Sequence, residues 1–240
     1  MSMTEAEQAA VFDKVKSLLI EGDSFEAVSY VNGLGEPLEV ARHYASLVGE
    51  LYSKERSVPS MLFLGRAGLQ YCLTKADDLA VQDPDLSRKL KGAAKVISFN
   101  LSANTWPGWG DEGITFSRQD SIAGLDAAKL NLRMVRELGE GPDPLSVSHW
   151  AIGSQYMALG EYEKALAAFE ASKGEAIVGN NKAGELLALG YIGITNILAK
   201  QIDRGKGELD EAIAGLEGLD TEDSRFFIDQ LKTALDIFSS

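Results

Sequence analysis

The chain has 240 residues, enough for one large domain or two small ones, and 45% of them are hydrophobic, which leaves ample material for a buried core. Its net charge of −13 argues against nucleic acid and anionic membrane surfaces as partners, because both bind clustered lysine and arginine. One cysteine, Cys72, excludes an internal disulfide, and His43 and His149 are too far apart for the usual zinc ligand set, so we expect no cofactor and no metal.

The N-terminus begins with polar residues and lacks the basic start and apolar run of a signal peptide. No stretch approaches the ~18 consecutive apolar residues that a membrane-spanning helix needs. A cytoplasmic location is therefore the default expectation, and a leader removed from the sequence would undo it.

Helix start and stop signals divide the first part of the chain into five predicted helices. Thr4 with Glu7 is typical of a capping box, and Gly22 ends the helix that follows. Asp83 before Pro84 is a second start signal, because aspartate accepts from free amides and proline suits the first turn. The remaining predicted helices cover Ser24 to Asn32, Pro37 onward, Pro59 to about Val81, and Pro84 to about Thr105. The helix from Pro59 is apolar on most sides, so we expect it to be central.

The second part contains six more predicted helices. Ser117 with Asp120 is similar to a capping box and starts one of them, and Asp143 with Pro144 is predicted to start the next. Residues Lys173 to Asn181 contain glycine and asparagine and are predicted to form a loop. The predicted helices are Ser117 to Leu138, two within Ser146 to Ser172, Lys182 to about Lys200, one ending at Leu216, and Glu222 to Phe238. No segment shows sustained apolar alternation, so the fold class is all-α, with about eleven helices.

Several glycines fall inside these helices, where each costs ~1 kcal/mol relative to alanine. They are Gly65, Gly68, Gly124, Gly153, Gly190 and Gly193. We expect close approach between helices to compensate for this cost.

The stretch Ser146 to Ser172, SVSHWAIGSQYMALGEYEKALAAFEAS, has two helical patterns separated by a short turn at Gly160. So short a turn between two apolar-faced helices makes them an antiparallel hairpin. This stretch resembles a tetratricopeptide repeat (TPR). The resemblance rests on Ile152, Gly153, Tyr156, Gly160, Tyr162, Ala165 and Phe169, while His149 occupies the usual tryptophan place, with Trp150 one residue late, and Ser172 a late alanine place.

The resemblance covers about one repeat unit, residues 146–179, close to the family's period of ~34 residues. It implies antiparallel helical hairpins stacked into a right-handed TPR-like superhelix, an α-α solenoid. We therefore predict one domain over residues 1–240, with degenerate helical pairs on either side of the central repeat and residues 219–240 as a capping helix.

Residues Asn100 to Arg118, NLSANTWPGWGDEGITFSR, form the most unusual stretch. Proline and glycine exclude a continuous helix there, so Trp106 and Trp109 lie on or beside a loop. One interpretation is a binding loop, with indole walls and with Asp111 and Glu112 as its carboxylates. The alternative, which we favour about two to one, is an inserted loop that its tryptophans pin to the helices.

Two further groups are candidate ligand contacts. Asn100 and Asn104 lie one turn apart on a helix and could hold a peptide backbone, although capping is the commoner role for such residues. The resemblance to TPR proteins implies that Trp150, Ser154 and Met157 face a concave groove. Packing of Trp150 against the preceding repeat is an equally weighted alternative.

Signals of catalysis are weak. Gly65 to Gly68 lacks the lysine of a phosphate-binding loop, and paired carboxylates such as Asp111 with Asp120 arise by chance among 36 acidic residues. Cys72 is expected to be a buried, inert thiol.

We therefore predict that the chain is not an enzyme but a scaffold that binds a protein or peptide segment, amphipathic or modestly basic, in its groove. Two alternatives stay open. One is a helical small-ligand binder or hydrolase that uses the Trp106–Glu112 loop. The other is a structural subunit that self-associates into a homo-oligomer through its end helices.

Overall fold

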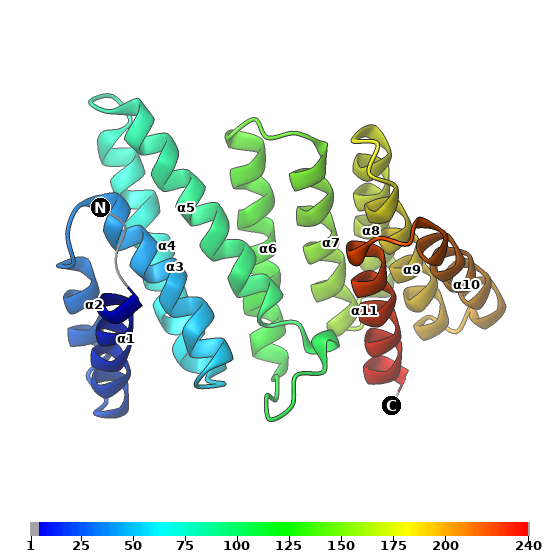
Figure 1. Cartoon of the computed structure of the whole chain (residues 1–240), viewed down its shortest axis with the longest axis horizontal. Helices are drawn as coiled ribbons and strands as arrows, with labels where there is room; N and C mark the ends of the chain where they lie inside the picture. Colours follow the sequence, from blue (N-terminus) through cyan, green and yellow to red (C-terminus); the bar gives the residue numbers. More distant parts are fainter. Residues whose placement is uncertain (1–4, 240) are drawn as a thin grey trace. The chain divides into compact units, whose positions relative to one another are not determined.

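The computed structural model describes residues 5–239, and within that range all regular structure is helical (Figure 1). Eleven α-helices and one 3-10 helix occur there, and no strand does, which confirms the all-α prediction. The predicted capping box at Thr4 lies outside the described residues.

The internal contacts of the chain separate it into two compact units, unit 1 up to Asn104 and unit 2 from Thr105. Unit 1 contains α1 (Glu5–Ile20), α2 (Ser24–Asn32), α3 (Pro37–Ser53), α4 (Val58–Leu79) and α5 (Pro84–Ala103). Unit 2 contains η1 (Pro107–Trp109), α6 (Arg118–Glu137), α7 (Pro142–Ala158), α8 (Tyr162–Val178), α9 (Lys182–Leu198), α10 (Ile202–Leu219) and α11 (Glu222–Ser239). The single domain over residues 1–240 stays a prediction.

Unit 1 is built around α4, which packs against both α3 and α5. The predicted start signals are confirmed here: the Asp83 carboxylate accepts from the amide of Leu86 at 3.0 Å, and α3 and α4 carry proline in their first turns. Gly68 lets the Tyr44 ring approach the α4 backbone, because an added Cβ would lie 2.7 Å from that ring. Burial of the Tyr44 ring thereby compensates for the low helix propensity of Gly68.

In unit 2, one turn geometry recurs at intervals of 20 or 21 residues. A residue with positive φ ends each of α6, α7, α8 and α9, namely Gly139, Gly160, Asn180 and Lys200. In each case the next amide donates to the carbonyl oxygen five residues earlier, as Glu161 does to Tyr156 at 2.9 Å. This pattern is the Schellman motif, which satisfies carbonyls at the helix end and reverses the chain.

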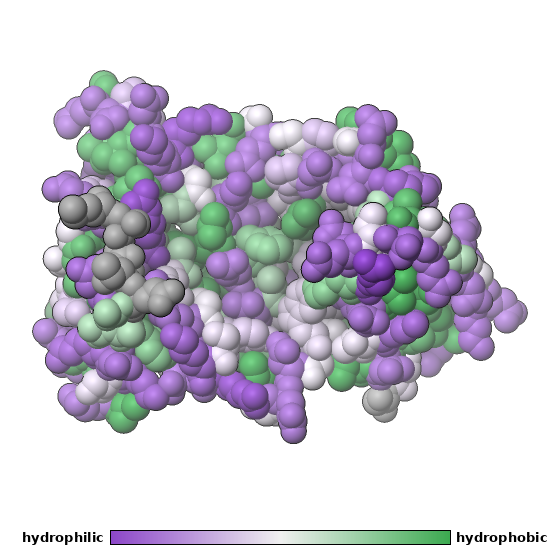
Figure 2. Space-filling view, in the orientation of Figure 1, coloured by the Kyte–Doolittle hydropathy of each residue, from purple (hydrophilic) through white to green (hydrophobic). Residues whose placement is uncertain are grey.

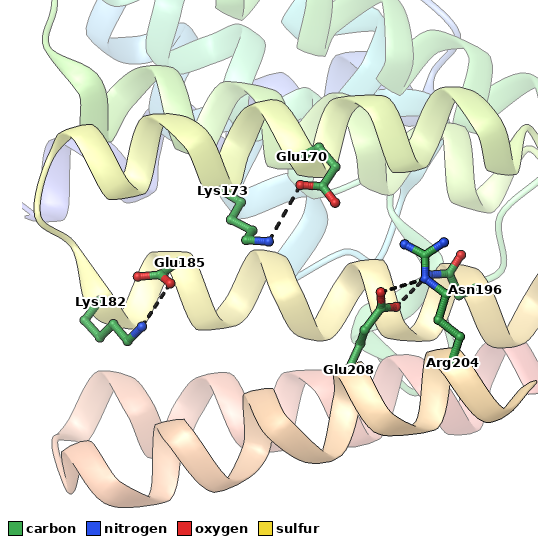
Figure 3. Close-up of polar contacts among 7 residues, drawn as sticks. All are labelled: Glu170, Lys173, Lys182, Glu185, Asn196, Arg204 and Glu208. Carbon is green, nitrogen blue, oxygen red and sulfur yellow. Dashed lines mark hydrogen bonds and ion pairs between the residues drawn. The ribbon is translucent and has the colours of Figure 1, made fainter. Parts of the chain in front are cut away.

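These turns make α7–α8 and α9–α10 equivalent hairpins, offset by 40 residues. Each pair is in extensive contact, and α8 also packs against α9. Gly153 and Gly193 occupy corresponding places, and both face the second helix of their hairpin. The second hairpin is further joined by Asn196, whose amide donates to Glu208 at 2.6 Å while Arg204 donates to the other oxygen of that carboxylate at 2.9 Å (Figure 3).

The prediction of a loop over Lys173 to Asn181 is wrong, because α8 continues to Val178. Ala176 is fully buried on this last turn, and Gly174 lies on the open side with nothing within 4 Å of its position for a Cβ. Burial of one face outweighs the low helix propensity of a single glycine.

The predicted start of α7 at Asp143 is also wrong. The helix starts at Pro142 with Gly141 as its N-cap, which places Asp143 inside the first turn. The Asp143 carboxylate accepts instead from the side-chain amide of Asn181 at 3.2 Å. Pro142, and not Pro144, takes the first helical position, where the backbone N–H that proline lacks would have no partner in the helix.

Candidate functional site

The tryptophan loop of unit 2 forms a tight turn. Pro107 to Trp109 make one turn of 3-10 helix, and Gly110 closes it in the left-handed region at φ +67. The amide of Gly110 donates to the carbonyl of Pro107 at 3.0 Å. Proline suits the start of this turn and glycine its end, so the local sequence explains the shape.

The turn places Trp106 at the centre of an aromatic cluster. Its side chain is 0% exposed, and its ring centroid lies 5.1 Å from that of Trp109, 5.6 Å from Trp150 on α7 and 5.7 Å from Tyr191 on α9. All three contacts are edge-on, the arrangement that the charge distribution of aromatic rings favours. Trp106 therefore fixes the loop to α7 and α9, as the favoured structural interpretation of this loop expects.

The C-terminal helix α11 covers this cluster. Phe226 lies 6.5 Å from Trp109 and Phe238 lies 6.3 Å from Trp106, measured between ring centroids. Leu231 is fully buried against α9 at Gly190, where an added Cβ would meet it at 2.5 Å. We call the surface beneath α11, formed by η1 and α9, the aromatic face.

One hydrogen bond links the helix to this face. The Gln230 amide donates to the hydroxyl of Tyr191 at 2.9 Å inside the protein. Burial raises the pKa of Tyr191 far above its usual value, and the hydrogen bond from Gln230 offsets only part of the rise. Tyr191 is therefore held neutral, and its ring packs within the cluster.

Among residues 5–239, the polar atoms near the cluster that have no hydrogen-bond partner include the indole nitrogen of Trp106 and the hydroxyl of Ser154. Buried polar atoms without partners are uncommon, and each costs about 1–3 kcal/mol. The free energy gained by packing the aromatic rings therefore outweighs the cost of leaving these polar atoms without hydrogen bonds.

The structure does not leave Trp150, Ser154 and Met157 open to a groove. They are 7%, 1% and 1% exposed, respectively. Trp150 lies under the tryptophan loop, and the hydroxyl of Thr195 on α9 approaches the Met157 sulfur at 3.5 Å. Residues far along the chain cover the face that the sequence pattern leaves free, so a ligand reaches these three side chains only if that cover moves.

The other predicted contacts are more accessible. Asp111 and Glu112 are exposed on the loop that follows η1. Asn100 and Asn104 are half-buried at the end of α5 in unit 1, where Asn104 is the C-cap and its amide donates to the Asn100 carbonyl. The aromatic cluster thus gathers Trp106, Trp109 and Trp150, all from unit 2.

Burial shifts the pKa values of Cys72 and of both histidines. Cys72 is buried, as expected, and burial raises the pKa of its thiol to about 12. Burial lowers the pKa of both histidines, and a carboxylate, Glu39 or Glu175, opposes the shift in each case. No cluster of histidine, cysteine and acidic side chains among the described residues could hold a metal ion. None of the helices described is long and apolar enough to cross a membrane.

Unit 1 contains an open groove that the sequence analysis missed. It lies between α2 and α4, has a volume of ≈ 550 Å³ and is lined by Val28, Pro59, Leu62, Phe63, Arg66 and Ala67. The sequence carried a signal for this groove, because the fourth helix is apolar on most of its sides and the neighbouring helices cover only some of those sides. A smaller cleft of ≈ 130 Å³ lies beside the ion pair between Lys16 and Glu55.

No protein-family model matches the chain, and no curated protein sequence matches it.

Proposed function

We propose that the chain is a non-catalytic, TPR-like scaffold whose aromatic face binds an amphipathic helix of a protein partner. The observation that carries this proposal is that the face already holds such a helix, α11, in this structure. In this proposal, α11 occupies the place that a partner helix would take.

The TPR-like assignment is supported by the equivalence of the two hairpins in unit 2. In the first, Gly153 admits the Phe169 ring, and Ala165 is fully buried. Gly153, Phe169 and Ala165 are among the residues on which the resemblance to a tetratricopeptide repeat rests. The corresponding residues of the second hairpin, Gly193 and Leu209, are also in close contact.

Complementarity between the aromatic face and an amphipathic helix supports the choice of ligand. Along α11 the side chains of Ile228, Leu231 and Ala234 are buried, and Asp229 and Lys232 are exposed. Apolar anchors at spacings of three and four residues are the pattern by which helices are recognised in grooves. A partner needs the same pattern, and the net charge of −13 favours one that is modestly basic.

Competition with α11 gives the mechanism. A tethered helix has a high effective concentration at its own site, so a partner binds only in the fraction of molecules in which α11 is displaced. A prearranged set of rings lowers the entropy cost for whichever helix binds. The exposed carboxylates of Asp111 and Glu112 then lie on the loop beside the bound helix.

A synthetic peptide of residues 220–240 tests this proposal on the full chain. Leu231→Asp weakens the packing of α11 in its own chain, so we expect this variant to bind the wild-type peptide at least ~10-fold more tightly than the wild-type chain does. Fluorescence anisotropy measures the affinity, and a peptide carrying Leu231→Asp is the matched control. Adding Trp109→Ala to the chain should weaken binding, because it removes one wall of the face.

Hydrogen exchange on the wild-type chain provides a second test that does not need a variant. We expect the amides of α11 to exchange before those of α9, since the proposal requires α11 to open while the rest of unit 2 stays folded. Equal protection of α9 and α11, with no peptide binding to the variant, would overturn the proposal. Concentration-dependent dimerisation of the Leu231→Asp variant would instead favour the self-associating subunit.

A further inference from the structure

The groove of unit 1 is formed by helices that have their main packing partners elsewhere. α2 packs on α1, and α4 packs on α3 and α5. Val28 faces the groove from α2, and Pro59, Phe63 and Ala67 face it from α4 at helical spacings of four. The α4 wall from Pro59 to Ala67 is about 12 Å long, or roughly two helical turns, at 1.5 Å per residue.

Two aromatic side chains make this surface costly to leave in water. Phe63 is 37% exposed in the groove, and Phe25 is 81% exposed three residues before Val28, on the same side of α2. Isolated apolar residues on a surface are ordinary, but an apolar groove lined by Phe63, with a second exposed phenylalanine on the helix that forms its other side, indicates an interaction site.

Arg66 is the one ionisable residue among the six that line the groove. It is exposed, and no ion pair found among residues 5–239 includes it. The chain has 36 acidic residues against 23 basic ones, so an unpaired guanidinium in an apolar groove is locally opposite in sign to the protein. This charge favours an acidic ligand and disfavours a basic one.

We propose that the α2–α4 groove is a docking site for an acidic amphipathic helix of a partner protein. Apolar anchors of that helix one turn apart contact Phe63 and Val28, and a carboxylate beside them pairs with Arg66 in a bidentate bond. The length of the α4 wall matches two turns of a bound helix. The site lies in unit 1, so it is independent of the aromatic face and of the function proposed for it.

Selection from two displayed peptide libraries tests this proposal on the full chain. Both libraries carry leucine or phenylalanine anchors at helical spacing, and their remaining positions are rich in glutamate in one and in lysine in the other. We expect the wild-type chain to enrich the glutamate library at least ~10-fold over the lysine library. Arg66→Glu should reverse this preference, because it reverses the charge of the groove.

Lys89→Glu is the matched control for net charge. Lys89 is exposed near the start of α5, which lies beside the far end of α4, because the Ser87 hydroxyl donates to the carbonyl of Ala76 at 2.7 Å. This variant should keep the preference for glutamate. Phe63→Asp should abolish the enrichment. If circular dichroism shows that the Phe63→Asp variant does not fold, the Phe25→Asp variant is used in its place.

Two results would overturn the proposal. One is that the wild-type chain enriches neither library above the background measured with Phe63→Asp, or with Phe25→Asp if that variant has replaced it. The other is enrichment whose charge preference is the same in Arg66→Glu and in the wild type, which would show that the peptides bind outside the groove.

Discussion

The two hairpins of unit 2 share one turn geometry but bring their helices together in different ways. In α7–α8, a Cβ added at Gly153 would lie 2.7 Å from the ring of Phe169, so a side chain fills the space that the glycine leaves. In α9–α10, a Cβ added at Gly193 would lie 2.7 Å from the carbonyl oxygen of Gly205 and from the amide of Leu209. In this hairpin the backbones of α9 and α10 are in direct contact, with Gly193 on one helix and Gly205 on the other.

This difference shows that a repeated turn determines the direction of the chain, while the residues at the crossing determine how closely the helices approach. A ring can shift by a few tenths of an ångström when its neighbour grows. A backbone held in a hydrogen-bonded helix moves only if the whole helix moves. Equivalent substitutions should therefore have unequal costs in the two hairpins.

Gly193→Ala should have the largest effect, a loss of roughly 3 kcal/mol in the free energy of unfolding, because the added methyl group pushes two helix backbones apart. Urea unfolding followed by tryptophan fluorescence measures it, and all three tryptophans lie in unit 2. The matched control is Gly207→Ala on α10, which has open space and should gain about 0.5–1 kcal/mol. A loss below about 1 kcal/mol for Gly193→Ala would remove the contrast between the hairpins.

Gly153→Ala should cost less, about 1–2 kcal/mol, since the Phe169 ring is able to yield and alanine has the better helix propensity. Phe169→Leu in the same chain should recover part of this loss relative to the sum of the single changes, because the smaller side chain makes room. The same urea experiment measures this coupling. Strict additivity would show that the methyl group clashes with something other than the ring.

The turns themselves should respond to substitution by about 1 kcal/mol. Lys200 has φ +68, which a lysine adopts at a cost, and Lys200→Gly should stabilise unit 2 by about 0.5–1 kcal/mol. Gly160→Ala should destabilise by about 1–2 kcal/mol at the equivalent turn, although nothing lies within 4 Å of the added methyl group. Opposite signs in urea unfolding would confirm that the two turns are equivalent, and equal signs would contradict it.

The smallest effect should come from His149 on α7. Burial lowers its pKa, and the nearby charge of Arg136 lowers it further. The unfolded chain then binds a proton more readily, so stability is complete above pH ~6.5 and falls as pH drops from there towards the folded-state value. This slope cannot exceed about 1.4 kcal/mol per pH unit for one histidine. Urea midpoints at pH 7.5 and 5.5 should differ less for His149→Gln than for the wild type, and an unchanged difference would show that other groups cause it.

The local features of the fold were predictable where one or two side chains decide them. The capping box at Ser117 and Asp120 is confirmed by reciprocal bonds, with the Ser117 amide donating to the carboxylate at 2.8 Å. The inference that glycines inside helices mark close approach is confirmed at Gly68, Gly153 and Gly193. The loop predicted from Lys173 is wrong because burial of Ala176 on the inner side of α8 outweighs the low helix propensity of Gly174.

The candidate site was predicted only as a set of unusual residues. Proline and glycine around Trp106 and Trp109 indicated an irregular segment, and the structure has a 3-10 turn there. Whether those indoles face water or the interior depends on α11, which begins more than 100 residues later. No local pattern carries that information.

Taken alone, the sequence determined the helices, their caps and the short turns, because these depend on backbone bonds and side chains only a few residues apart. Tertiary structure decided that α11 covers the tryptophans while the groove beside Phe63 and Arg66 stays open. The physical reason is that burial of apolar surface depends on which distant segments meet, and helical periodicity marks an apolar face without naming its partner.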